Sequence, residues 1–123
     1  MSTYSANQEI KDLLWGTPMP IAARINAEMV LVRIKGSCSL IVNDAGLLQE
    51  KLPDLKSLAS QVRSTLALAA TDAIAEISRT ISSFEQLEKL PDFSMLLKTK
   101  AMDELSGFGL KLGDLDIHSV ERA

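Results

Sequence analysis

The clearest pattern in the chain is an alternation of apolar and polar positions between residues 29 and 43. Its apolar positions are Val30, Val32, Ile34, Cys38, Leu40 and Val42, with Gly36 between the two groups of three. A period of two is typical of a strand with one buried face. The glycine leaves two arrangements open, a tight hairpin at residues 35–37 or one long bent strand with a glycine bulge.

The next segments follow a helical pattern. Asn43 and Asp44 supply an N-cap for a short helix over 45–52, which Pro53 ends. Asp54 can then cap a long helix over 54–79, where apolar residues recur every three or four positions. Those positions are Leu55, Leu58, Val62, Leu66, Ala69, Ala73 and Ile77.

The last third of the chain predicts two more helices and a returning strand. Ser82 and Glu85 form a capping-box pattern that opens a helix over 82–90. A helix over 92–106 follows, and Gly107 or Gly109 can provide its left-handed cap. Its stripe is Phe93, Leu96, Leu97, Ala101 and Leu105, and the strand over 110–120 carries Leu110, Leu112, Leu115, Ile117 and Val120.

These elements predict one mixed α+β domain over residues 1–123. A small sheet from strands near 29–43 and 110–120 is expected to pack against helices near 45–52, 54–79, 82–90 and 92–106. Residues 1–11 are interpreted as a weakly ordered lead-in, and residues 21–29 as a short extended or irregular link.

Between the lead-in and the link lies the segment around the chain's one tryptophan. We interpret it as a rigid turn formed by Trp15, Gly16, Thr17, Pro18 and Pro20. The indole of Trp15 is expected to anchor the turn on the core and to donate its N–H to a carbonyl. The alternative is an exposed tryptophan at a binding site or interface.

Composition and charge exclude several classes of protein. The 123 residues are 46% hydrophobic and 24% charged, as in a soluble globular chain. A net charge of −3 without a basic run argues against binding nucleic acid through its phosphates. No stretch approaches the ~20 apolar residues of a membrane span. The polar start is not typical of a signal peptide. The chain is therefore expected to be cytoplasmic.

Few residues suggest catalytic or metal-binding chemistry. Cys38 and His118 could form a nucleophile–base pair, but the phase of the strand favours a buried thiol and an exposed imidazole. Asp114 and Asp116 share a strand face, which suits either a cation or a solvated edge. The glycines at 107, 109 and 113 lack the Lys-Ser/Thr of a phosphate loop. We therefore predict no catalytic residue, no metal and no cofactor.

Three blocks carry a family resemblance: DLLWGTPMPI at 12–21, VLVRIKGSCSLIVND at 30–44 and LSGFGLKLGDLDIHSV at 105–120. In order and spacing they resemble the bacterial SPFH (stomatin, prohibitin, flotillin, Hfl) or band 7 group, and most of all its virion-core-protein-like subfamily. Cys38 stands where that subfamily usually has an aromatic residue, and Ala45 where it often has proline. The family's N-terminal strands and membrane anchor are expected to be missing from this chain.

The resemblance implies a non-catalytic scaffold that oligomerises and gathers protein partners. It implies membrane contact only indirectly or through other segments, and allows a full-length protein at the inner face of the cell membrane. The alternative is a module that binds a small ligand or a lipid headgroup. A homo-oligomer is expected to join through the strand region 29–43 or the long helix over 55–79, with candidate interface residues Val30, Val32, Ile34, Leu40, Val42, Leu58, Val62 and Leu66.

Overall fold

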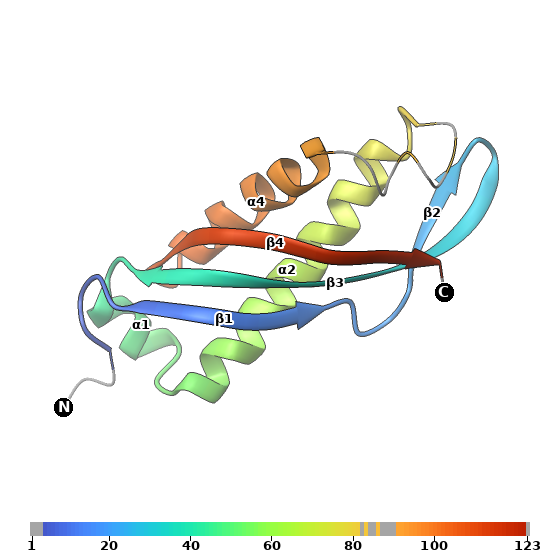
Figure 1. The fold of residues 1–123 in the computed structure, drawn as a ribbon. Coiled ribbons are helices and arrows are strands. Elements are labelled where there is room, and N and C mark those ends of the chain that lie inside the picture. Colours follow the sequence, from blue (N-terminus) through green and yellow to red (C-terminus); the bar gives the residue numbers. More distant parts are fainter. Residues whose placement is uncertain (1–3, 82, 84–85, 87–90, 123) are drawn as a thin grey trace.

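A four-stranded antiparallel sheet carries helices on one face (Figure 1) in the computed structural model, which describes residues 4–81, 83, 86 and 91–122. The chain is therefore of the α+β class, as predicted. Its elements in order are β1 (Glu9–Gly16), β2 (Ile21–Ile25), β3 (Glu28–Val42), α1 (Ala45–Lys51), α2 (Leu55–Ile77), α4 (Pro91–Ser106) and β4 (Leu110–Arg122).

Strand β3 is the centre of the sheet. Strands β1 and β2 pair with successive parts of β3 along the same edge, β1 with residues 35–41 and β2 with residues 28–32. Strand β4 pairs with the opposite edge over residues 32–42. All three partners run antiparallel to β3, so β1 and β4 are parallel to each other on the two sides of the sheet.

The structure decides between the two arrangements predicted around Gly36. Residues 28–42 form one continuous strand, and every even-numbered position from Val30 to Val42 is buried. Gly36 keeps this phase, so it causes no shift of the apolar face. The irregularities of register lie in the partners instead: β1 has an extra residue between Ile10 and Leu13, and β4 has one at His118 and another between Leu112 and Leu115.

The N-terminal quarter corrects the sequence-based expectation. Part of the expected lead-in belongs to β1, and the expected link contains β2, which forms a two-residue hairpin with β3. Asn26 and Ala27 at the tip both have positive φ (52° and 67°), as a type I′ turn requires. Before β1, the Tyr4 side chain is buried and its hydroxyl donates to the Leu52 carbonyl at 2.8 Å.

Helices α1 and α2 begin at the N-caps that the sequence predicts. The carboxylates of Asp44 and Asp54 accept the backbone N–H of Leu47 and Ser57, at 3.0 and 2.7 Å. These bonds satisfy donors that the first turn of a helix leaves unpaired. Most of the predicted helix over 82–90, including both residues of its capping box, lies outside the described residues.

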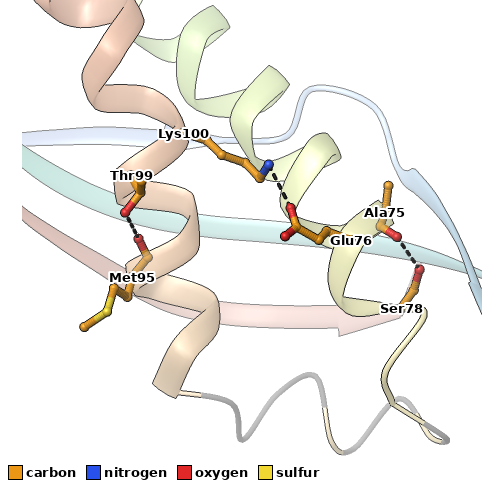
Figure 2. A network of polar contacts seen from close by, with 6 residues as sticks. All are labelled: Ala75, Glu76, Ser78, Met95, Thr99 and Lys100. Carbon is orange, nitrogen blue, oxygen red and sulfur yellow. Dashed lines mark hydrogen bonds and ion pairs between the residues drawn. The ribbon is translucent and has the colours of Figure 1, made fainter.

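Helix α2 packs against β1 and β2, and α4 packs against β4. The core between the layers contains the predicted helix stripes, except that Leu55 is 56% exposed and Leu96 is half-buried. Figure 2 shows an ion pair between Lys100 of α4 and Glu76 of α2 at 2.9 Å. The opposite face of the sheet has no helix among the described residues. None of the described helices combines the length and the apolar character that a membrane crossing needs.

Candidate functional site

The expected turn around Trp15 is the junction between β1 and β2. Trp15 and Gly16 end β1, and Thr17, Pro18 and Pro20 lie in the connection to β2. Trp15 is 4% exposed, and its Nε1 has no hydrogen-bond partner among the described residues, contrary to the expected bond to a carbonyl. These burial data favour an anchoring role over an exposed binding site for Trp15.

Thr17 fixes the junction to the central strand. Its N–H donates to the Ile34 carbonyl at 3.0 Å, and its Oγ1 accepts the Ile34 N–H at 3.1 Å. The hydroxyl thus completes the pairing of β3 at a point where neither β1 nor β2 supplies a strand partner. This contact could not be predicted from the sequence, because it depends on the register of β1 along β3.

The eight residues expected at an oligomer interface form the core of the chain itself. They are Val30, Val32, Ile34, Leu40, Val42, Leu58, Val62 and Leu66, and none is more than 6% exposed. The apolar face of β3 and that of α2 thus belong to the same buried layer. A side chain enclosed within its own chain cannot also face a partner, so any interface must use other residues.

Cys38 and His118 lie on opposite faces of the sheet. Cys38 is buried among core residues, and burial raises the pKa of its thiol to about 11, so the thiolate is disfavoured at neutral pH. His118 is exposed, and its Nε2 lies 3.0 Å from Oγ of Ser37. A nucleophile–base pair also needs a third group that orients the base. No other described side chain hydrogen-bonds to His118, so the Ser37–His118 contact supplies two of the three groups.

Asp114 and Asp116 border a polar hollow of about 230 Å³ that spans three strands. Glu9 and Asp12 of β1 and the serines at 37 and 39 of β3 complete most of its lining. The Ser39 hydroxyl accepts the Asp114 N–H at 2.9 Å. Within residues 4–81, 83, 86 and 91–122, no three His, Cys, Asp or Glu side chains converge as metal ligands.

A large groove runs along the β1 edge of the sheet, beside α2. Its volume is about 740 Å³, and we call it the α2 groove. It is lined by Gly16, Pro18, Lys56, Ala59, Ser60, Arg63, Ser64, Ala67 and Leu68. Arg63 Nε donates to the outward carbonyl of Leu14 at 2.8 Å. Leu14 and Leu68 are both 61% exposed beside this edge, although apolar surface is normally buried.

A second groove follows the other edge of the sheet, between α4 and β4. Its volume is about 310 Å³, and we call it the α4 groove. It is lined by Ser94, Met95, Lys98, Asp114, Leu115 and Asp116. The Ser94 hydroxyl reaches the Leu115 carbonyl at 3.5 Å, and Met95 is 69% exposed.

The two grooves lie on opposite edges of the sheet at the same height, that is, at the same position along the strands. Leu14 of β1 and Asp116 of β4 are both paired with Ser37 of β3, so the three residues form one row across the strands. Arg63 contacts this row through Leu14. The sequence could have pointed to Leu68 and Met95 as apolar residues outside their helix stripes, but the row depends on register.

Comparison with known proteins gives no identification. The chain matches no protein-family model and no curated protein.

Proposed function

We propose that this chain is a non-catalytic scaffold domain that assembles with copies of itself, as its resemblance to the SPFH or band 7 group implies. One observation carries the proposal: both edges of the sheet end in a groove with a large exposed apolar side chain, Leu68 at one edge and Met95 at the other. Exposed strand edges and exposed apolar surface both favour association with another chain.

The described residues also supply little for catalysis, since the thiol of Cys38 is buried and the Ser37–His118 pair lacks an orienting group. The function of such a domain would come from what it holds together. Partner proteins would then bind to the assembled form, which presents the same surface many times.

Light scattering coupled to size-exclusion chromatography tests the proposal over a wide range of protein concentration. We expect a mass above that of the 13.4 kDa monomer. Replacing Leu68 with Gln should lower the mass, because it removes apolar surface from the α2 groove. Leu31→Gln is the matched control, since Leu31 is 46% exposed on the face without helices. A monomer at every concentration would refute self-assembly, and a loss of mass in the control alone would move the interface to that open face.

The second candidate is a site for an anionic lipid headgroup in the α2 groove. Lys56 and Arg63 lie there with the hydroxyls of Ser60 and Ser64, and the remaining lining is apolar or glycine. Sedimentation with phosphatidylglycerol vesicles tests this function, with phosphatidylcholine vesicles as the neutral control. Binding to the anionic vesicles that Lys56→Gln with Arg63→Gln abolishes would support it, and equal recovery with both lipids would refute it.

A further inference from the structure

We infer that copies of this chain join head to tail, with the α4 groove and β4 edge of one copy against the α2 groove and β1 edge of the next. Asp116 of one copy then faces Arg63 of its neighbour. The inference rests on the proposed function, because it specifies the surface through which self-assembly would occur. It uses three observations: the register of the strands, the charges of the grooves and the sizes of the side chains in them.

Register places the two grooves opposite each other. Leu14, Ser37 and Asp116 form one row across the sheet, and Arg63 is bonded to the Leu14 end of that row. In the next row, Cys38 pairs with Leu115, whose carbonyl receives the Ser94 hydroxyl. Two copies set side by side without a slip along the strands therefore bring the Asp116 end of one row to the Arg63 end of the other.

The two strand edges can meet in that arrangement. Strands β1 and β4 are both antiparallel to β3, so a simple lateral repeat places β4 of one copy parallel to β1 of the next. The evenly spaced hydrogen bonds of parallel strands are open to the edge groups on either side of this row, because the Leu14 and Leu115 carbonyls already accept Arg63 Nε and the Ser94 hydroxyl. The helices repeat in the same direction, since α2 packs over one edge and α4 over the other. Both layers of the domain would thus continue from copy to copy.

Charge favours this arrangement over a twofold one. The charged residues of the α2 groove are both cationic, Lys56 and Arg63, whereas the α4 groove has Asp114 and Asp116 against Lys98. Opposite signs across an interface favour pairing, and like charges disfavour it. A twofold contact of two α2 grooves would set cations against cations. A twofold antiparallel pairing of β4 over its full length, Leu110–Arg122, would centre on Asp116 and oppose it to itself.

Side-chain size is complementary as well. The floor of the α2 groove is formed by small side chains on neighbouring turns of the helix, Ala59, Ser60, Ser64 and Ala67. The α4 groove presents Met95, a long and flexible side chain that is mostly exposed. Arg63 uses its Nε for Leu14, and the guanidinium has four further N–H donors with which to bind a carboxylate.

When a contact joins two different surfaces of the chain, a dimer still has one unused surface at each end. Each copy keeps one α2 groove and one α4 groove for further neighbours, so assembly continues into a ring or a filament. This consequence separates the inference from every twofold alternative.

Oxidative cross-linking of the intact chain tests the inference. Ser64→Cys and Met95→Cys place thiols at the same height in the two grooves, and the native Cys38 is buried. We expect the double variant to give a ladder of dimer, trimer and larger products. Each single variant should give none, because residue 64 then faces Met95 of the neighbour. Wild-type protein is the control for Cys38, and the melting temperature of each variant is the control for folding.

Charge reversal gives the second measurement. Arg63→Glu and Asp116→Arg should each shift the protein to lower mass, and a mixture of the two variants should restore the higher mass because opposite charges meet again at every junction. A ladder that stops at dimers, or dimers from either single-cysteine variant, would overturn the head-to-tail contact. Oligomers without any cross-link would overturn this contact and leave the proposed function standing. A monomer in light scattering at every concentration would overturn both.

Discussion

The indole of Trp15 occupies the space beside Gly36 in which any other residue would carry its side chain. The two residues are paired across β1 and β3, and a Cβ on Gly36 would lie 3.0 Å from Cε2 and from Cζ2 of Trp15. On the other side, the same Cβ would collide with the backbone carbonyl of Asp116. The glycine is therefore what lets the tryptophan enter the core without shifting the central strand.

Gly36→Ala should destabilise the fold by about 1–3 kcal/mol, the usual cost of overpacking a core. Trp15→Ala should cost about 3–5 kcal/mol, because it leaves a cavity where a large aromatic side chain was. Both changes are measured by urea unfolding. In the Trp15→Ala background, the penalty of Gly36→Ala should shrink but persist, since the Asp116 carbonyl stays in place. Additive penalties would show that the indole and the glycine do not interact.

The hairpin between β2 and β3 contains a strained alanine. Ala27 has a φ of 67°, which costs an L-residue roughly 1–2 kcal/mol and glycine almost nothing. Ala27→Gly should therefore raise the free energy of unfolding by up to about 1 kcal/mol, after the greater entropy of glycine in the unfolded chain is counted. Ala22→Gly is the matched control, because Ala22 is an exposed residue of β2. This substitution should lower the free energy of unfolding. Equal effects of both substitutions on thermal unfolding would contradict this account of the turn.

Gly109 connects α4 to β4 and also holds the start of α1. It has a φ of 80°, and its carbonyl accepts the N–H groups of Asn43 and Asp44 at 2.8 and 3.0 Å. Gly109→Ala should lower the free energy of unfolding by about 1–3 kcal/mol, because the methyl group adds left-handed strain and collides with the Asp44 carbonyl.

Gly46 offers a matched control for that substitution. It lies within α1, where an added Cβ would meet only a side-chain oxygen at 3.6 Å. Gly46→Ala should be stabilising by up to about 1 kcal/mol, the difference in helix propensity. Chemical denaturation of both variants measures the contrast, and a stabilised Gly109→Ala would contradict the role assigned to Gly109.

Stability should fall at alkaline pH because of Cys38. Its pKa is raised from 9.0 to about 11 by burial, so the unfolded chain loses the thiol proton first. The protonated thiol makes its full contribution to the free energy of unfolding below pH 9, and this contribution is lost as the pH rises through 11. Cys38→Ala should be less stable at neutral pH but should lose less stability between pH 9 and 11. Parallel pH profiles of the two proteins in urea unfolding would contradict this coupling.

Local signals in the sequence predicted the helices well. The carboxylates that cap α1 and α2 lie three residues before the N–H groups they accept, so their geometry is contained in a short stretch of chain. The stripes of α2 and α4 follow from helical periodicity alone. The same local reasoning missed β1, because its extra residue near Asp12, which has a φ of 55°, breaks the alternation that marks a strand.

The candidate surface was much harder to predict. Apolar stripes on β3 and α2 suggested an interface, but the two stripes bury each other, and periodicity cannot say which partner covers a stripe. Arg63 and Asp116 drew no attention as a pair, because they come from different elements and meet opposite ends of one row of the sheet.

The sequence by itself determined the type of β3, β4, α1, α2 and α4 and the buried faces of β3, α2, α4 and β4, because capping and periodicity act within one or two turns of chain. It also determined that Cys38 would be buried, through its phase in β3. Only the tertiary structure decided that Gly36 belongs to one unbroken strand, that its neighbour across the sheet is Trp15, and that the two grooves lie at the same height. Those relationships depend on the register of strands that are distant in sequence, and register is set by the packing of the whole sheet against its helices.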